Sequence, residues 1–392
     1  MKFIHLSDLH IGKKVNDFSM MEDQKYILSQ IIEIIKEQKV EGVWIAGDIY
    51  DKSIPSAEAV QLFDEFLTEL AGLKLPVFAI SGNHDSAERI AFGARLMNTC
   101  RIYMSPVYDG SISPVILQDD YGEIAIYQLP FIKPALVRHV YDTKDSAAAS
   151  ASSECRAEAV ITYQDAVRTA IEHMQIDGKR RNVLLSHQFV TGAIRSDSED
   201  ISVGGIDNVD SSVFDGFDYV ALGHIHNAQH IGRDTIRYCG TPLKYSFSES
   251  NHTKYAVIVD LKEKADIQIE EIPLVPLHDL REIKGSYHEI TARDFYKDMN
   301  VHDYLHITLT DEDDILDAIG KLRSIYPNIM KLDYDNMRTR KNQTLEHTDY
   351  VKQRSPLELL KEFYMLQNNR PMNDEQSAYV CKLIEDIWEV AK

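Results

Sequence analysis

Cysteine is scarce in this sequence of 392 residues, which contains four of them. Cys100, Cys155, Cys239 and Cys381 are far apart and form no Cys-x-x-Cys pair. This spacing argues against a disulfide-stapled scaffold and against a zinc site built from thiolates. We therefore expect free thiols that are buried in the protein.

Long hydrophobic runs are also missing. No stretch approaches the roughly 20 apolar residues that a membrane-spanning helix needs. The opening MKFIHLSDLH is too short and too polar for a secretory signal. We therefore expect a cytoplasmic protein that does not bind membranes.

Positive charge is in deficit, since 42 Lys and Arg face 62 Asp and Glu and leave a formal net charge of −20. A protein that holds nucleic acid through basic side chains alone carries the opposite sign. The composition thus argues against a free-standing DNA-binding module. It does not exclude nucleic acid as a substrate, because bound cations or a partner subunit can reverse the local field.

Short apolar strands alternate with amphipathic helices through the first 140 residues or so. This alternation predicts a mostly parallel sheet that is covered on both faces. The predicted strands are 2–7, 42–47 and 75–81, and the predicted helices are 20–38 and 56–72. Five further strands, 124–130, 181–187, 218–223, 235–240 and 254–261, have fewer helices between them and predict a second sheet packed on the first. The Ser/Ala-rich stretch 143–158 predicts a mobile surface insertion.

Polar side chains follow five of these apolar runs at the point where each strand ends. In open α/β sheets, ligands bind beyond the carboxyl ends of the strands. The side chains found there are Asp8, His10, Asp48, Asn83, His187, His224 and His226. Glycines stand beside them at 47, 82 and 223 and allow sharp turns and close approach of the backbone.

Carboxylates, an amide oxygen and imidazoles are ligands that suit manganese, iron or zinc. Seven candidate ligands exceed the needs of one ion, so we expect two ions that share a bridging carboxylate. Paired ions of this kind stabilise the attacking and leaving oxygens of an in-line displacement at phosphorus.

The motifs SDLH, GDIYD, SGNHD, LSH and GHIH, in this order, resemble those of the calcineurin-like metallophosphoesterases over roughly the first 245 residues. The resemblance implies an α/β fold, a two-sheet sandwich. It implies that Asp8, His10 and His226 hold one metal ion, that Asn83, His187 and His224 hold the other, and that Asp48 bridges them. It further implies that His84, which is not a ligand, protonates or positions the leaving oxygen, and that Asp85 orients it.

Two neighbouring residues have competing interpretations. His5 lies on the opposite face of the first strand from Asp8, and we expect it to be a core residue. At the position of Asp51, archaeal and eukaryotic double-strand-break nucleases of the superfamily tend to carry histidine. Bacterial relatives carry aspartate there, as this chain does. Its role stays open, and a capping contact in the following turn is as good an interpretation.

Two downstream segments, GTPLKYSFSES (240–250) and SPLELLKEFYMLQ (355–367), resemble the bacterial SbcD family. Members of this family are the nuclease subunits of the SbcCD complex. The resemblance implies a two-metal DNA nuclease, with manganese as the favoured ion, that cuts DNA ends, single strands and hairpins in repair, recombination and replication. It also implies an SMC-like ATPase partner of the SbcC type, a homodimer of the nuclease subunit and a heterotetramer with the partner.

These resemblances and the residue pattern together predict four parts of the chain. They are a nuclease domain (1–275), a small α+β capping domain that contacts DNA (280–340), a linker (341–354) and C-terminal helices (355–392). Basic side chains of the capping domain either reach DNA phosphates or form a solvated face; they are Lys321, Arg323, Lys331, Arg338, Arg340 and Lys341. The apolar faces of the C-terminal helices either dock on their own chain or bind the coiled-coil base of the ATPase partner.

Two other functions compete with the nuclease. One is a calcineurin-like phosphatase or cyclic-nucleotide phosphodiesterase, since the metal motifs alone leave the substrate open. The other is a scaffold that retains the fold without catalysis. The second is disfavoured because all seven ligand positions carry competent side chains.

Overall fold

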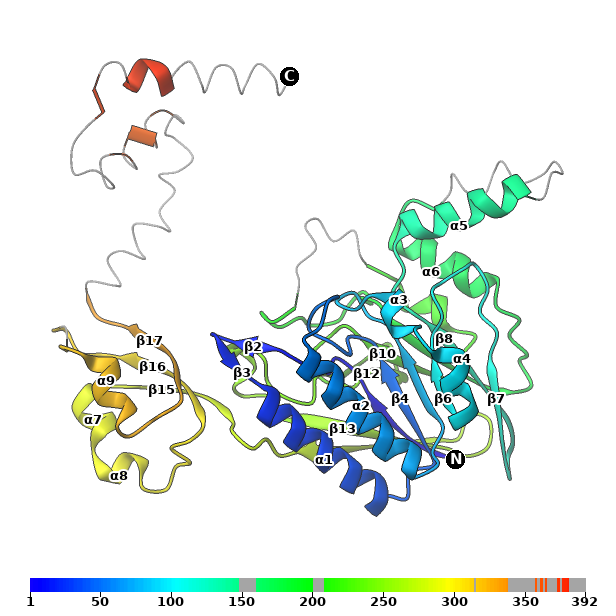
Figure 1. Cartoon of the computed structure of the whole chain (residues 1–392), viewed down its shortest axis with the longest axis horizontal. Helices are drawn as coiled ribbons and strands as arrows, with labels where there is room; N and C mark the ends of the chain where they lie inside the picture. The colour runs from blue at the N-terminus through cyan, green and yellow to red at the C-terminus, as the bar shows by residue number, and fades with distance from the viewer. Residues whose placement is uncertain are drawn as a thin grey trace.

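The computed structural model describes residues 1–147, 160–199, 208–313 and 315–337, together with 357, 360, 361, 364, 372, 373 and 376–380. Two six-stranded sheets form a sandwich, and a three-stranded sheet builds a smaller unit beside it (Figure 1). The α/β sandwich with an added α+β unit predicted from the sequence is therefore confirmed. No helix within the described residues is long and apolar enough to cross a membrane.

The first sheet has a parallel centre and two antiparallel strands at one edge. Its strands, in order across the sheet, are β14 (Ile267–Leu274), β13 (Lys254–Leu261), β1 (Lys2–Leu6), β4 (Gly42–Ala46), β5 (Val77–Ile80) and β6 (Ile102–Met104). The assignment of 254–261 to the second sheet was wrong, because β13 pairs with β1, Val257 facing His5. Its apolar run indicates that the strand is buried but carries no information about its neighbour.

Two long helices, α1 (Met21–Glu37) and α2 (Ala57–Gly72), cover the outer face of this sheet (Figure 1). Helix α2 begins after Ser56, whose hydroxyl accepts a hydrogen bond from the N–H of Ala59. Such a cap satisfies one of the N–H groups left unpaired at a helix start. Short helical turns follow β5; they are α3 (Ala87–Ile90), α4 (Ala94–Met97) and η1 (Asn98–Cys100).

The second sheet is also parallel at its centre. Its strands, in order, are β11 (Gln229–Ile231), β12 (Arg233–Tyr238), β10 (Tyr219–Gly223), β9 (Arg181–His187), β8 (Gly122–Leu129) and β7 (Val115–Asp119). Helices α5 (Pro134–Ala147) and α6 (Tyr163–Glu172) pack on its outer face, and η3 (Ser211–Phe214) and η4 (Phe247–Glu249) lie in loops. Helix α5 runs into the predicted insertion as far as Ala147, and the rest of that insertion lies outside the described residues.

The space between the two sheets is filled by aromatic and branched side chains from both. The ring of Trp44 stacks on Phe3 with centroids 4.4 Å apart and on Tyr219 at 5.4 Å. His5 also lies here, fully buried, with Nδ1 3.1 Å from the Tyr219 hydroxyl and Nε2 3.1 Å from the Leu222 carbonyl oxygen. The prediction that His5 is a core residue is confirmed.

The smaller unit contains β15 (Leu280–Gly285), β16 (Tyr304–Leu309) and β17 (Ile329–Tyr334), which are parallel to one another. Helices α7 (Tyr287–Thr291), α8 (Arg293–Tyr296) and α9 (Ala318–Arg323) cover it. The hairpin of β2 (Lys14–Val15) and β3 (Phe18–Ser19) projects from the sandwich towards this unit (Figure 1). We call this unit the capping unit.

The described cysteines only partly match the expectation of buried thiols. Cys239 is buried and free, whereas Cys100 is exposed in the turn η1. The expectation rested on the apolar character of cysteine. Cys100 nevertheless lies in a surface turn between α4 and β6, where its side chain is exposed. Cys155 and Cys381 lie outside the described residues.

Candidate metal centre

The carboxyl ends of five strands from the two sheets meet at one edge of the sandwich. Asp8 and His10 follow β1, Asp48 follows β4 and Asn83 follows β5; His187 ends β9, and His224 and His226 follow β10. The sequence predicted this convergence, and the structure brings all seven side chains together. Parallel strands cause it, because their carboxyl ends share an edge.

Four of the seven residues have backbone angles that ordinary residues rarely adopt. The φ angles are +52° at Asp8, +43° at His10, +48° at Asp48 and +104° at His224. Each such conformation costs on the order of 1–3 kcal/mol and persists where the surroundings enforce it. Hydrogen bonds from Asp8 N to Gly47 O and from His10 N to Asp48 O, both 3.0 Å, hold the loop after β1 in this shape.

Two glycines let the strand ends approach one another. A Cβ at Gly223 would lie 1.9 Å from the Ala46 carbonyl oxygen, and a Cβ at Gly82 would lie 2.1 Å from Asp48 Oδ1. Gly223 thus permits contact between the two sheets, and Gly82 permits contact between neighbouring loops. Any larger residue would push the ligand side chains apart.

The first group of potential ligands contains Asp8, His10 and His226, each offering an atom within 4.8 Å of the others. His10 Nε2 lies 3.2 Å from His226 Nε2 and 3.7 Å from Asp48 Oδ2. Asp8 is fixed by the Ser7 hydroxyl and by the N–H of His224.

The second group centres on the amide oxygen of Asn83. His187 Nε2 lies 3.0 Å from Asn83 Oδ1, and His224 Nδ1 lies 2.9 Å from the same atom. His187 Nε2 is also 3.3 Å from Asp48 Oδ2. Asp48 therefore lies between the two groups, within 4 Å of a histidine of each.

Burial sets the protonation of most of these histidines. It lowers the pKa of His10 and of His224 to about 3 and holds the pKa of His226 well below its usual value. These rings are therefore neutral near pH 7, and each keeps a lone pair for a cation.

The charges of Asp8, Asp48 and His187 affect one another's protonation. Burial raises the pKa of Asp8 to about 7. Burial also lowers the pKa of His187, but the Asp48 carboxylate outweighs it and the pKa of His187 rises to about 9. The same pairing holds the pKa of Asp48 well below its usual range, despite the burial that raises it.

The residues fit two divalent cations. Two carboxylates, an amide oxygen and four imidazoles face one another, and neither of the described cysteines is among them. The close approach of His10 Nε2 and His226 Nε2 is the arrangement expected when both lone pairs point at one ion. The His187 Nδ1 lies 2.8 Å from the Ala46 carbonyl oxygen, which accepts a hydrogen bond there, so Nε2 is the ring nitrogen that a cation would bind in place of its proton.

His84 lies at the rim of this centre, and its side chain is 24% exposed. Its Nε2 is 4.0 Å from Asp48 Oδ2, and its Nδ1 is 3.1 Å from the carbonyl oxygen of Asp51. Asp85 accepts hydrogen bonds from the N–H groups of Ile49 and Gly82. Asp85 thus fixes the loop that carries His84, whereas the Asp51 carbonyl oxygen contacts the His84 ring itself.

Asp51 also faces the metal centre through its side chain. Its Oδ1 lies 2.7 Å from Lys13 Nζ and 3.8 Å from His10 Nδ1. The backbone N–H of Asp51 donates to the Ile11 carbonyl oxygen at 3.2 Å. Asp51 therefore connects the loop after β4 to the loop after β1.

Several supporting residues escaped the sequence analysis. They lie in loops behind His226 and are Ser198, Glu199 and Glu249. Ser198 and Glu199 lie in the short stretch SDSE, which is ordinary in surface loops, and Glu249 lies in the segment GTPLKYSFSES, which indicated the family but not a contact with the metal centre. Their contacts depend on how loops far apart in the chain pack together.

Comparison with known proteins matches both parts of the chain. A family described as calcineurin-like phosphoesterase matches residues 1–228, and one described as type 5 capsule protein repressor C-terminal domain matches residues 276–368. The chain is 32% identical over 393 residues to the SbcD subunit of the nuclease SbcCD from Staphylococcus epidermidis, covering 99% of each chain.

Solved structures similar to this chain include a dimetal phosphatase from Danio rerio, with 14% identity and a TM-score of 0.39, covering 70% of this chain and 96% of the other. They also include the protein TT1561 of Thermus thermophilus, with 9% identity and a TM-score of 0.37, covering 69% of this chain and 98% of the other.

Proposed function

This chain belongs to the calcineurin-like phosphoesterases and, within them, to the SbcD nuclease subunits, and from that membership we propose that it hydrolyses DNA with two divalent cations. The observation that carries the proposal is the position of Asp48 between two groups of histidines at one sheet edge. Relatedness along the whole chain to a nuclease subunit supports DNA as the substrate.

In this proposal the ligands would divide between two ions. Asp8, His10 and His226 would hold one, and Asn83, His187 and His224 would hold the other, with Asp48 shared; the proximity of these side chains supports this division. When bound, the cations supply Lewis-acid stabilisation of the phosphoryl oxygens and lower the pKa of the attacking water. We propose manganese as the preferred ion, because the resemblance to the SbcD family implies it and the oxygen and imidazole ligands are compatible with it.

His84 handles the proton of the leaving group. The Asp51 carbonyl oxygen can only accept, so Nδ1 of His84 carries a hydrogen and the ring is fixed in one tautomer. Its Nε2 is then the atom that gains and loses a proton at the rim of the centre, within reach of a departing sugar oxygen. Asp85 keeps the loop in place through backbone contacts.

The proposed assembly has a nuclease domain (1–275), a capping domain (280–340) and C-terminal helices (355–392) that bind an SMC-like ATPase of the SbcC type. We propose a homodimer of this chain within a heterotetramer, acting on DNA ends, single strands and hairpins. The partner would supply basic surface that a chain of net charge −20 lacks. The linker and most of the C-terminal helices lie outside the described residues.

The capping unit offers some of the proposed phosphate contacts. Lys321, Arg323 and Lys331 are exposed, and Lys331 Nζ lies 2.7 Å from Asp333 Oδ2. Arg338, Arg340 and Lys341 lie outside the described residues. Contacts of this kind position a duplex without reading its sequence.

Replacement of His84 separates catalysis from metal binding. The His84→Ala variant is expected to lose at least 100-fold in cleavage of linear and hairpin DNA, because general acid catalysis typically contributes 10²–10⁴-fold. Its manganese content, measured by elemental analysis, should equal that of the wild type. His230→Ala is the matched control, since His230 is exposed on β11 and pairs with Asp234.

A phosphatase or a small-molecule phosphodiesterase would give a different pattern in the same assay. The proposal fails if the wild type with manganese leaves DNA intact but hydrolyses phosphomonoesters or cyclic nucleotides. If His84→Ala loses the metal, His84 is a ligand, and the role proposed for it is wrong.

A further inference from the structure

Each polar atom of His226 that does not face the metal centre has a hydrogen-bond partner. Its N–H donates to Glu199 Oε1 at 2.7 Å, and its carbonyl oxygen accepts from Lys254 Nζ at 2.8 Å. Its Nδ1 lies 2.6 Å from the hydroxyl oxygen of Ser198. The remaining ring nitrogen, Nε2, points at His10.

The Ser198 hydroxyl also contacts a buried ion pair between Glu249 and Lys254. It donates to Glu249 Oε1 at 2.6 Å, and the other carboxylate oxygen of Glu249 accepts from Lys254 Nζ. The side chain of Glu249 is fully buried, and that of Lys254 is 6% exposed. Lys254 also donates to the Thr241 hydroxyl at 2.8 Å.

The chemistry of these groups fixes the direction of each hydrogen bond. A carboxylate paired with an ammonium is an acceptor, so the Ser198 hydroxyl must donate its hydrogen to Glu249. The Ser198 oxygen then accepts from His226 Nδ1–H. This places the ring proton on Nδ1 and the lone pair on Nε2, the atom that faces Asp8 and His10.

We propose that Ser198 and Glu249 are positioning residues of the metal centre, which hold His226 in the tautomer and orientation that bind a cation. The inference rests on the proposed ligand role of His226 and deepens it. Histidine ligands of metals usually donate their second N–H to a fixed acceptor, and loss of that acceptor typically weakens metal affinity 10–100-fold.

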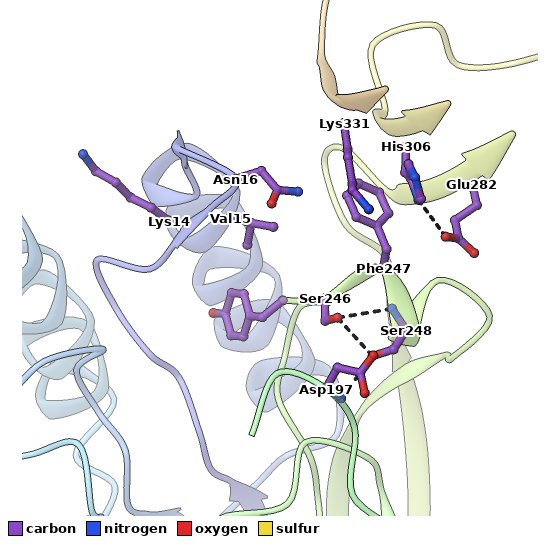
Figure 2. A pocket seen from close by; sticks show the side chains of 11 residues that line it. Lys14, Val15, Asn16, Asp197, Ser246, Phe247, Ser248, Glu282, His306 and Lys331 are labelled. Atoms are coloured by element: carbon purple, nitrogen blue, oxygen red, sulfur yellow. Dashed lines mark hydrogen bonds and ion pairs between the residues drawn. The ribbon is translucent and has the colours of Figure 1, made fainter. Parts of the chain in front are cut away.

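The neighbouring hydroxyls provide a control on the same loops. Ser248 lies next to Glu249 and accepts from Asp197 N at 3.2 Å, while its hydroxyl contacts Ser246 at 3.0 Å (Figure 2). Asp197, Ser246 and Ser248 line a cavity of about 530 Å³ between the hairpin β2–β3 and the capping unit. Removal of the Ser248 hydroxyl therefore disturbs the same loops without touching the His226 ring.

The test measures manganese binding to the full chain by calorimetry, without DNA. Ser198→Ala is expected to bind manganese at least about 10-fold more weakly than the wild type. Ser198→Thr, which keeps a hydroxyl, and Ser248→Ala should both bind within about threefold of the wild type. Thermal unfolding followed by circular dichroism checks that each variant is folded.

Wild-type affinity in Ser198→Ala would overturn the inference. An equal loss in Ser198→Ala and in Ser248→Ala or Ser198→Thr would also overturn it, because the effect would then belong to the loop and not to the hydroxyl. The proposed function is judged separately, by DNA cleavage. If the protein binds manganese but does not cleave DNA, the proposed nuclease function is wrong. The manganese affinity of Ser198→Ala still tests the role of Ser198 in that case.

Discussion

Arg181 and Asp119 illustrate, at the scale of single residues, how buried charge ties the two sheets together. Arg181, on β9 of the second sheet, donates to the carbonyl oxygen of Leu261 on β13 of the first sheet at 3.1 Å. It also pairs with Asp119, which accepts from the N-terminal ammonium of Met1 at 2.7 Å. Burial raises the pKa of Asp119, but Arg181 and the N-terminus outweigh it and lower the pKa to about 2.

This pKa predicts how stability changes in acid. The carboxylate is more acidic in the folded chain than its usual value near 3.9, so its contribution is present above about pH 4 and is lost as pH falls towards 2. Asp119→Asn should lower the free energy of unfolding by about 2 kcal/mol at pH 7, as expected for a charge-assisted hydrogen bond. Urea denaturation at pH 7, 4 and 3 should find the difference from the wild type shrinking with acidity. A difference that is the same at all three pH values would contradict it.

At the scale of elements, the loops after β1, β4, β5 and β10 matter more for the metal centre than the strands themselves. Each loop turns sharply at the strand end, and the positive φ angles of Asp8, Asp48 and His224 aim side chains into a common space. Glycine supplies room where two loops meet, as at Gly82. The strands position these loops, and the conformation of the loops determines which atoms face the candidate metal centre.

Gly82→Ala is expected to disrupt this arrangement. The added methyl group would lie 2.1 Å from Asp48 Oδ1 and 2.4 Å from Asp48 N, so Asp48 must move. Manganese affinity measured by calorimetry should fall at least 10-fold, a loss of about 1.4 kcal/mol. Gly72→Ala is the control: it lies in α2, and a Cβ there would meet nothing within 4 Å. Equal affinities in the two variants would argue against a steric role for Gly82.

At the scale of the whole molecule, a small polar cluster fastens the capping unit to the sandwich. Asp23 on α1 is fully buried and accepts from His278 N and His278 Nδ1, each at 3.0 Å. It also accepts from the hydroxyl of Tyr304, the first residue of β16, at 2.7 Å. The segment between β14 and β15 is thereby fixed against α1, next to the hairpin that points towards the capping unit (Figure 1).

Removal of the Tyr304 hydroxyl should loosen this attachment. Tyr304→Phe keeps the ring beside Phe18 but leaves the buried Asp23 carboxylate with one donor fewer, which costs about 1–3 kcal/mol. Hydrogen exchange in 275–285 should become roughly 10-fold faster, since 1.4 kcal/mol corresponds to a factor of ten. Tyr121→Phe, at an exposed tyrosine, is the control. Unchanged exchange in Tyr304→Phe would show that the cluster does not restrain the capping unit.

Local patterns in the sequence determined most of the sandwich and the set of candidate ligands. Hydrophobic periodicity identified β1, β4, β5, β9 and β10, and the polar residues directly after them are the ones that converge. This prediction succeeded because the burial of a strand is visible in its own apolar run, and because the carboxyl ends of parallel strands share an edge. Within the range of the predicted capping domain, the structure has strand β16, helix α9 and strand β17.

Only the tertiary structure decided which distant groups meet. It placed β13 beside β1, gave His84 the Asp51 carbonyl as a partner and brought Ser198 and Glu249 behind His226. None of these contacts has a periodic signal, because each joins loops or edges whose positions depend on the packing of the whole sandwich. Residue types therefore determined which chemistry this protein can support. The packing of the whole fold determined which side chains and carbonyl groups position the candidate metal ligands and His84.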